Sequence, residues 1–388
     1  MLYEIHMLKN YPPVNLNRDD TGSPKTCYFG GVQRGRISSQ CLKRSWRKSD
    51  LYEQLLGECG IRTEYLPRRL EAELNKKGYD DKAFIEEAKR KACSMMIKEE
   101  PNSNEKDSKD QRDKKQGKKD DFNKTAQTIF YSPEDIEVIA QVMINLYNDN
   151  GKSIKAFQDI KKDELMKHFD DAKTRSITLD IAMFGRMVTS SALRNVEAAV
   201  QVAHAISTHE VKQESDYYTA VDDLLAENEE SGASMIGDID FNACCYYHYA
   251  SINTDLLHEN LKGECNDLDN TLLPALIRIM AYTNPSGKQN SFAGHILPSL
   301  ICVEIKEDKI PVSYANAYAT PIYARKNSVV EKSVSNLRDE INKIDRAFGL
   351  KTKRLWFSPD NYEGPEKAIK CNTIQELCEK LTSVESKW

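Results

Sequence analysis

One stretch of the chain cannot take part in a hydrophobic core, and it therefore limits what the rest can fold into. Residues 98–124 contain nine basic and eight acidic side chains and a single aromatic residue. Such a segment has too little apolar surface to offset the conformational entropy that ordering it would remove. We expect a disordered, solvated insertion. Because its charges nearly cancel, a linker fits it better than a nucleic-acid-binding tail.

Outside that insertion the chain shows two kinds of hydrophobic pattern. Alternating apolar, β-branched and aromatic residues predict strands at residues 2–9, 197–211, 241–253 and 299–306. Apolar residues at helical spacing predict helices at about 61–75, 80–97, 132–147, 155–171, 268–285, 328–348 and 373–385. The helices between roughly residues 60 and 175 form one lobe inserted between strand-bearing segments. The order strand, helix, strand, strand, helix, strand predicts an α+β fold, ferredoxin-like in its simplest form.

Composition excludes several classes of protein. The chain has 388 residues, long enough for two or three subdomains, and no apolar run approaches the ~20 residues that a membrane span needs. The first residues do not read as a signal peptide. The ten cysteines are scattered without the spacing of a zinc site, which favours reduced thiols in the cytoplasm. No nucleotide-binding or metalloprotease motif occurs, so we expect no cofactor and no metal.

The basic stretch at residues 25–48 runs against the acidic background of the chain. It holds seven Lys or Arg and no Asp or Glu, whereas the whole chain has a formal charge of −5. Ser38 and Ser39 predict the start of a helix that packs through Leu42 and Trp46. Four cations share an arc of about 140° on the other side of that helix: Lys43, Arg44, Arg47 and Lys48. This pattern predicts a surface for a polyanion. The alternative is an ordinary solvated basic helix.

Three large apolar or aromatic residues stand outside any periodic core pattern. Tyr217 and Tyr218 precede a polar, glycine-containing segment at 219–240 that suits an exposed hairpin or long loop, and Met187 follows Gly185 and Arg186. A basic surface combined with such wedges is typical of proteins that hold a single nucleic-acid strand. The alternative is that both tyrosines cap the core at the base of the hairpin.

Two arrangements could instead carry catalysis. Three carboxylate pairs could hold metal ions for a nuclease: Asp19 with Asp20, Asp222 with Asp223, and Asp238 with Asp240. Neighbouring residues usually point apart, and these lie in predicted turns, which favours caps and turn formers. His204 and His209 flank a strand end, where an acid–base pair for RNA cleavage could sit, although His204 also fits a packed strand residue.

Seven segments together resemble one known family. They are LNRDD (16–20), FGGVQRGRISSQCLKRSWRKS (29–49), DIAMFGRM (180–187), AHAISTHEV (203–211), DYYTAVDDL (216–224), SGKQNSFA (286–293) and PVSYANAYA (311–319). The chain resembles the CasC (Cse4) family, the repeated backbone subunit of the type I-E CRISPR Cascade surveillance complex. The resemblance spans nearly the whole chain apart from the charged insertion and the last helices.

The resemblance implies an α+β fold with an RNA-recognition-motif-like (ferredoxin-like) palm, an inserted helical fingers lobe and a β-hairpin thumb. It implies that copies polymerise along a CRISPR RNA (crRNA), each thumb kinking the guide against the next copy. Target DNA would be reached through the guide, and the other Cascade subunits (the large, small and crRNA-end-binding subunits) would be partners. We expect palm at residues 1–58, 178–208 and 241–388, fingers at 59–177 and thumb at 209–240.

The family's guide contacts map onto this chain motif by motif. The resemblance implies backbone contacts from Arg18, Lys25, Ser38, Gln40, Lys43 and Arg47. We also expect Arg44 to contact the guide, because it lies on the same arc of the helix as Lys43 and Arg47. Met187 would insert beside a base, Tyr217 and Tyr218 would lie on the thumb near the displaced nucleotide, and Lys288 would belong to a basic loop. We expect none of these residues to be catalytic.

The hypothesis is therefore a non-catalytic scaffold that holds guide RNA for pairing with target DNA in antiviral defence. One alternative is a metal-dependent ribonuclease that cuts RNA paired to the guide, with Asp222 or Asp223 as its metal ligand. Another is a protein-interaction module whose basic face meets acidic partners.

Overall fold

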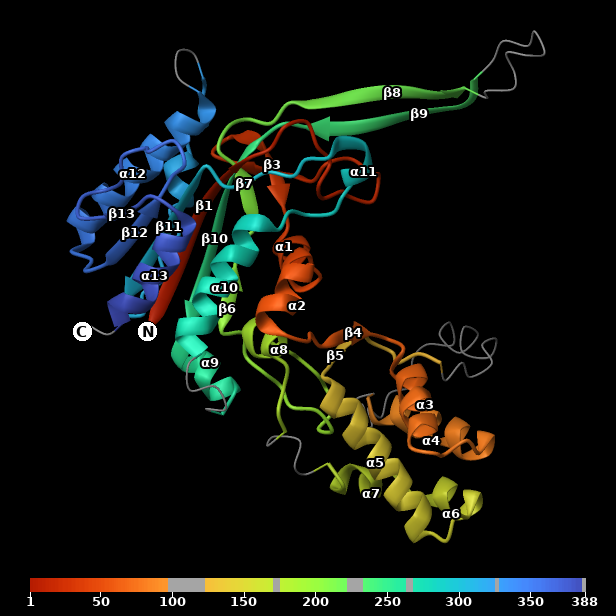
Figure 1. Ribbon diagram of the computed structural model, residues 1–388. Coiled ribbons are helices and arrows are strands. Elements are labelled where there is room, and N and C mark those ends of the chain that lie inside the picture. Colours follow the sequence, from red (N-terminus) through yellow and green to blue (C-terminus); the bar gives the residue numbers. More distant parts are fainter. Residues whose placement is uncertain (97–122, 170–174, 222–232, 263–267, 325–327, 386–388) are drawn as a thin grey trace, which may run out of the picture. The chain divides into compact units, whose positions relative to one another are not determined.

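The computed structural model describes residues 1–96, 123–169, 175–221, 233–262, 268–324 and 328–385 (Figure 1). Most of the predicted insertion at 98–124 lies outside the described residues. The chain divides into two compact units. The sheet unit comprises Met1–Gly57, Val200–Glu259 and Gly263–Trp388, and the helical unit comprises Glu58–Ala199 and Asn260–Lys262. Each unit is described by itself.

The sheet unit is built on a nine-stranded sheet in the order β13-β12-β11-β1-β10-β7-β3-β2, with β6 also paired to β10. Its strands are β1 (Leu2–Asn10), β2 (Thr26–Phe29), β3 (Val32–Ile37), β6 (Val200–Val202), β7 (Ala205–Ser207), β10 (Cys245–Asn253), β11 (Leu300–Lys306), β12 (Lys353–Phe357) and β13 (Ile369–Cys371). The predicted strands near residues 2–9, 241–253 and 299–306 are present. The one predicted at 197–211 is split into β6 and β7. Strands β2, β3, β12 and β13 were not predicted.

Four neighbouring strands reproduce the expected ferredoxin-like core. In chain order the strands are β1, β7, β10 and β11, and in space they run β11-β1-β10-β7, all antiparallel. That is the 4-1-3-2 order of a ferredoxin-like sheet, in which the third strand lies between the first two and the fourth lies outside the first. In register, Ile5 lies opposite Ala250 on one side and Val303 on the other. The predicted α+β fold class is confirmed.

Both faces of this sheet are buried. Leu8 and Tyr247 point to the face that helix α12 (Val329–Phe348) covers with Leu337 and Ile341. Residues of β1 that alternate with Leu8, such as Ile5, point to the other face and are equally buried. The remaining helices of this unit are α1 (Ser39–Arg47), α2 (Asp50–Leu56), α9 (Thr254–Asn260), α10 (Leu268–Tyr282), α11 (Gln289–Phe292) and α13 (Ile374–Glu385), with a short 3₁₀ helix at Ala315–Tyr318.

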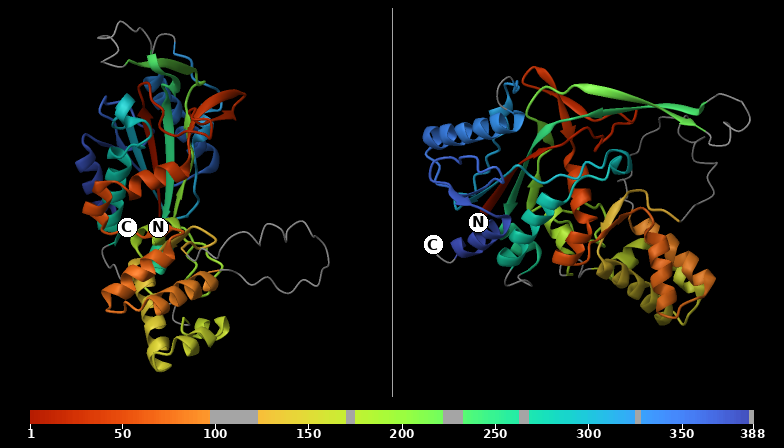
Figure 2. Two further views of the ribbon diagram at one scale, coloured as in Figure 1. Left: turned by 90° about the vertical axis from the view of Figure 1, so that its right-hand side faces the viewer. Right: turned by 45° about the horizontal axis from the view of Figure 1, so that its top comes forward.

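A two-stranded hairpin projects from the sheet unit. Strands β8 (Gln213–Val221) and β9 (Ala233–Asn242) pair antiparallel with each other and form their own small sheet. Figures 1 and 2 show it extending away from the large sheet. The predicted hairpin is therefore present. Asp222 and Asp223, the ligands of the nuclease alternative, lie outside the described residues.

The helical unit carries its own hydrophobic core. It contains β4 (Ile61–Thr63), α3 (Leu66–Lys76), α4 (Lys82–Met95), β5 (Ile129–Tyr131), α5 (Pro133–Asp149), α6 (Ile154–Asp159), α7 (Lys162–Lys167) and α8 (Leu179–Phe184). Helix α5 begins with a capping box in which Ser132 and Asp135 each accept the other's backbone N–H. The stretch at 155–171, expected as one helix, forms two because the backbone is extended at Ile160.

One predicted domain boundary differs from the structure. Residues 178–199 were expected in the palm, but they belong to the helical unit. The carboxylate of Asp180 accepts the backbone N–H of Gly60 at 3.0 Å, and Ala182 accepts the side-chain amide of Asn260 at 2.9 Å. These bonds secure α8 to the helical unit. In the part of the chain that the structure describes, no helix is long and apolar enough to cross a bilayer.

Candidate nucleic-acid interface

Helix α1 begins where the two serines predicted it. Ser38 is the N-cap: its hydroxyl accepts the backbone N–H of Cys41 at 3.2 Å, and its own N–H donates to the side chain of Asn17 at 2.8 Å. Leu42 and Trp46 are buried, as expected for the packing side of the helix. Ser38 itself is also largely buried. Because it caps α1, it determines where the helix begins and therefore where its cations lie.

The four predicted cations of α1 are not equally accessible. Arg44 and Lys48 are exposed, and Gln40 is exposed on the first turn. Lys43 is half-buried, and burial lowers the pKa of its ammonium group. Arg47 is only 8% exposed, so the expectation that it lies on the open face is wrong. Helical spacing gives the arc that the cations share, but it does not say which edge of that arc packs.

A second group of cations gathers around Arg36 of strand β3: Lys25, which precedes β2, and Lys43 of α1, together with His204. The backbone N–H of Arg36 donates to the carbonyl of Lys25 at 2.8 Å, and the Arg36 guanidinium lies 2.9 Å from His204 Nδ1. Burial lowers the pKa of His204, and the charges of Arg36, Lys25 and Lys43 lower it further. The three cations therefore act together on His204, and we call these four residues the β3 cluster. His204 is exposed rather than packed.

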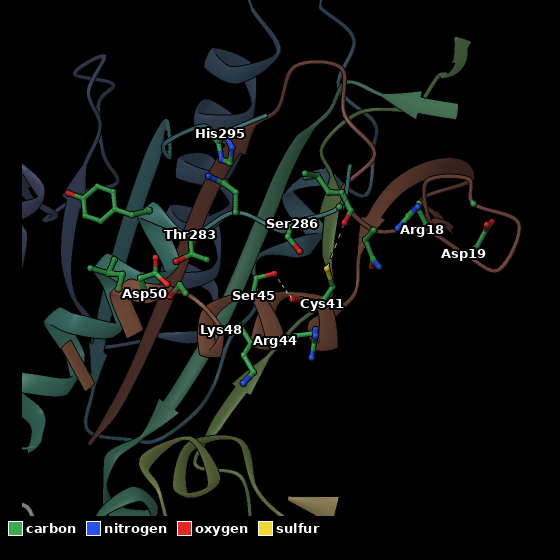
Figure 3. A pocket seen from close by; sticks show the side chains of 18 of the residues that line it. Arg18, Asp19, Cys41, Arg44, Ser45, Lys48, Asp50, Thr283, Ser286 and His295 are labelled. Atoms are coloured by element: carbon green, nitrogen blue, oxygen red, sulfur yellow. Dashed lines mark hydrogen bonds between the residues drawn. The ribbon is translucent and has the colours of Figure 1, made fainter. Parts of the chain in front are cut away.

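A cleft of about 1210 Å³ opens on the other side of α1 (Figure 3). Three segments line it: residues 16–22, residues 41–51 across α1 and α2, and residues 282–287 with His295. Its cations are Arg18, Arg44 and Lys48, and its acids include Asp19 and Asp50. Figure 3 shows Arg44 and Lys48 on α1, with Arg18 on the neighbouring loop. The structure thus places Arg18 and Arg44 on the lining of one cleft.

Lys288 lies at the edge of the same region. It is half-buried and precedes α11, directly after Gly287, which lines the cleft. The α11 residue Phe292 packs against Phe241 at the root of the hairpin, with ring centroids 5.7 Å apart. The basic loop containing Lys288 therefore adjoins both the cleft and the hairpin.

The root of the hairpin is bonded to the loop that carries Arg18. The Asp240 carboxylate accepts hydrogen bonds from Ser215, Ser23 and Gln213 at 2.5, 2.6 and 2.7 Å, and these bonds lower its pKa. The Asp240 carbonyl also accepts the side-chain amide of Asn15 at 2.8 Å. Asp240, considered above as a metal ligand, is thus a structural acceptor.

Tyr217 and Tyr218 are both exposed on β8, but they face opposite sides of the hairpin because successive strand residues alternate. Tyr218 lies opposite Gly237, and a Cβ added to Gly237 would approach the Tyr218 ring to 2.6 Å. The ring therefore covers the glycine backbone across the strand pair. Tyr217 is 65% exposed, compared with 37% for Tyr218. Tyr217 is therefore the more accessible of the two rings.

Met187 projects from a rigid turn of the helical unit and is 94% exposed. The preceding Arg186 is buried and forms an ion pair with Asp135 at 2.5 Å. Arg186 also donates to the carbonyls of Phe130 and Arg194 at 3.2 and 2.9 Å. The apolar side chain therefore stands on a fixed support.

Acid–base cleavage by a histidine pair finds no support in this geometry. His209 has both ring nitrogens engaged, one 2.8 Å from the carbonyl of Glu210 and the other accepting the backbone N–H of Cys245 at 3.3 Å. His204 faces the Arg36 guanidinium instead. Among the residues described, no three His, Cys, Asp or Glu side chains gather as a metal site.

Comparison with known proteins identifies the family. The family model described as "CT1975-like protein" matches residues 3–380, so the chain belongs to this family. One similar solved structure is described as "CRISPR RNA-guided surveillance complex, pre-nicking". Its chain is 25% identical, with a TM-score of 0.82, and the match covers 99% of this chain and 100% of that one. No curated protein matches.

A second solved structure, described as "CRISPR RNA-guided surveillance complex", is 21% identical with a TM-score of 0.72, and it supports the fold alone. Its match covers 99% of this chain and 100% of that chain. Together with the family match, the full-length likeness confirms the resemblance to the CasC family that the sequence motifs predicted.

Proposed function

We propose that this member of the CT1975-like family is a non-catalytic subunit of a CRISPR RNA-guided surveillance complex. Several copies polymerise along one guide RNA, kink it at intervals and present the intervening bases to target DNA. Its partners are the guide RNA, further copies of itself, the other subunits of the complex, and target DNA through the guide.

The observation that carries this proposal is the concentration of cations around α1. The β3 cluster lies on one side of the helix, and the cleft with Arg18, Arg44 and Lys48 lies on the other. Cations bind phosphates without reading bases, which is what a protein that accepts any guide sequence needs. The full-length likeness to a chain of an RNA-guided complex supports the same assignment.

Two exposed side chains would set the conformation of the bound strand, which the cations alone do not set. Tyr217 on the hairpin and Met187 in the helical unit each present an exposed aromatic or apolar side chain, and Met187 directly follows the buried Arg186–Asp135 pair. A ring or thioether against a base face separates neighbouring bases and gives the strand a defined bend. Charge then holds the strand, and the projections set its geometry.

The test is the double variant Lys43→Glu, Arg44→Glu, co-expressed with a CRISPR RNA and purified. We expect less RNA to be retained through purification than by the unchanged chain, seen as a fall in the ratio of absorbance at 260 and 280 nm. The slope of log affinity against log salt should decrease in magnitude by about 1.4, because each phosphate contact to a single strand contributes about 0.7. The thermal melt followed by circular dichroism should not change.

Lys76→Glu, Lys332→Glu is the matched control, since it makes the same change in charge at exposed positions of two other helices, α3 and α12. It should retain the RNA. Equal RNA retention by the two double variants, with both folded, would refute the proposal.

A further inference from the structure

A second basic surface lies at the far end of the same sheet. A cavity of about 540 Å³ opens there between the last turn of α12, the loop leading into β12 and the loop before β13. We call this the α12 surface. Its cationic lining residues are Arg346, Lys351, Lys353, Arg354 and Lys367.

The local charge is opposite to that of the chain as a whole. Residues 342–354 and 366–370 contain seven Lys or Arg and two acidic residues, in a chain of net charge −5. One of those acids, Asp345, is bonded to Arg354 at 2.5 and 2.7 Å. Glu366 is then the remaining acid facing Arg346, Lys351, Lys353 and Lys367 in the cavity. Arg346, Lys351 and Lys367 are exposed.

The α12 surface is distinct from the interface around α1. In the strand order, β12 lies near one edge of the sheet and β3 near the other, with β11, β1, β10 and β7 between them. At about 4.8 Å between strands, β12 and β3 are about 24 Å apart in the sheet. A nucleotide held at α1 therefore does not reach the α12 surface, and a ligand there is a separate strand segment.

An exposed aromatic residue stands in the chain between two residues that line the cavity, Arg346 and Gly349. Phe348 is the last residue of α12 and is 73% exposed, and Gly349, which lines the cavity, ends the helix in the left-handed conformation. Cations near a helix C-terminus also neutralise its dipole. That role accounts for Arg346, but not for Lys353 and Lys367, which come from other segments, nor for the exposed ring.

We propose that the α12 surface is a second, sequence-independent binding site for a single nucleic-acid strand. Arg346, Lys351 and Lys367 hold successive phosphates, and Phe348 stacks on a base. Exposed cations beside an aromatic ring are the combination by which proteins bind single strands without reading their sequence. This inference goes beyond the proposed function, because the guide is assigned to the opposite edge of the sheet.

The experiment isolates the second site by working in the Lys43→Glu, Arg44→Glu background. Fluorescein-labelled 20-nucleotide DNA, RNA of the same sequence and the corresponding DNA duplex are titrated by anisotropy at several salt concentrations. Added to this background, Lys351→Glu, Lys367→Glu should weaken single-strand binding at least about tenfold and reduce the salt slope by about 1.4. Phe348→Ala should weaken it roughly tenfold for single strands and less than about twofold for the duplex. The DNA and RNA arms show which strand binds more tightly.

Lys76→Glu, Lys332→Glu in the same background is the control for overall charge. The proposal would be overturned if Lys351→Glu, Lys367→Glu bound single strands within about twofold of this control. It would also be overturned if Phe348→Ala left the single-strand affinity unchanged. Absence of binding in the α1 background itself would also overturn it. The guide test above uses the intact α12 surface, so each proposal can fail without the other.

Discussion

The two kinds of contact that we assign to the guide are built in opposite ways. Around α1 the contacting groups are cations on exposed or half-buried side chains, and the helix below them is secured by Leu42 and Trp46. At Met187 the contacting group is apolar, and the charges lie underneath it as the buried Arg186–Asp135 pair. Around α1 we assign the charged side chains to contact with the guide. At Met187 the charged side chains instead stabilise the protein below the contacting group. The comparison suggests that affinity and strand geometry are separable properties of this chain.

The largest expected effect comes from breaking the buried support. Asp135→Ala leaves the Arg186 guanidinium buried without its carboxylate, and removing one partner of such a pair costs about 3–5 kcal/mol of unfolding free energy. The measurement is urea unfolding of the chain without RNA, followed by circular dichroism.

Met187→Ala is the paired variant, and it should change the unfolding free energy by less than about 0.5 kcal/mol because its side chain is 94% exposed. Equal stabilities for the two variants would mean that the ion pair does not support the turn.

We expect an effect of intermediate size from variants of the two tyrosines of the hairpin. Tyr217→Ala should weaken RNA binding by about 1–3 kcal/mol, the range for one stacked base, without changing the melt. Tyr217→Phe keeps the ring and should restore binding. Tyr218→Ala should instead loosen the hairpin, because it uncovers Gly237. Affinities by filter binding together with hydrogen exchange of β8 and β9 distinguish the two roles. A larger affinity loss in Tyr218→Ala than in Tyr217→Ala, with the hairpin intact, would reverse the assignment.

The smallest expected effect is a pH dependence at the β3 cluster. Burial and the nearby cations lower the pKa of His204 below its ordinary value of 6.5, so it is neutral in the RNA-free protein at neutral pH. RNA phosphates favour its protonated form and raise that pKa, so binding takes up a proton. Affinity should therefore rise a few-fold as the pH falls toward the lowered pKa of His204. His204→Gln should flatten that rise, and an unchanged pH profile would place His204 away from the guide.

The sequence predicted elements that are determined locally. Helix α1 was found because Ser38 caps it and Leu42 and Trp46 recur at helical spacing, and α5 was found from Ser132, Pro133 and its apolar stripe. Strands β12 and β13 were missed because they are short and lie at the sheet edge. β12 exists through its pairing with β11, about fifty residues earlier. No local sequence pattern predicts a pairing between strands so far apart in the chain.

The candidate site shows the same limit. The basic stretch drew attention to α1, but the contact between Arg36 and His204 joins residues 168 positions apart. The burial of Arg47 and the opposite directions of Tyr217 and Tyr218 depend on which neighbours the fold supplies. Family resemblance named residues, whereas only the structure shows which of them are accessible.

The most direct test of the central claim is native mass spectrometry of the chain co-expressed with CRISPR RNAs of increasing length. A scaffold that polymerises along its guide predicts assemblies that contain one RNA each and gain whole chains in proportion to RNA length. One chain per RNA at every length, or chain without RNA, would contradict the account.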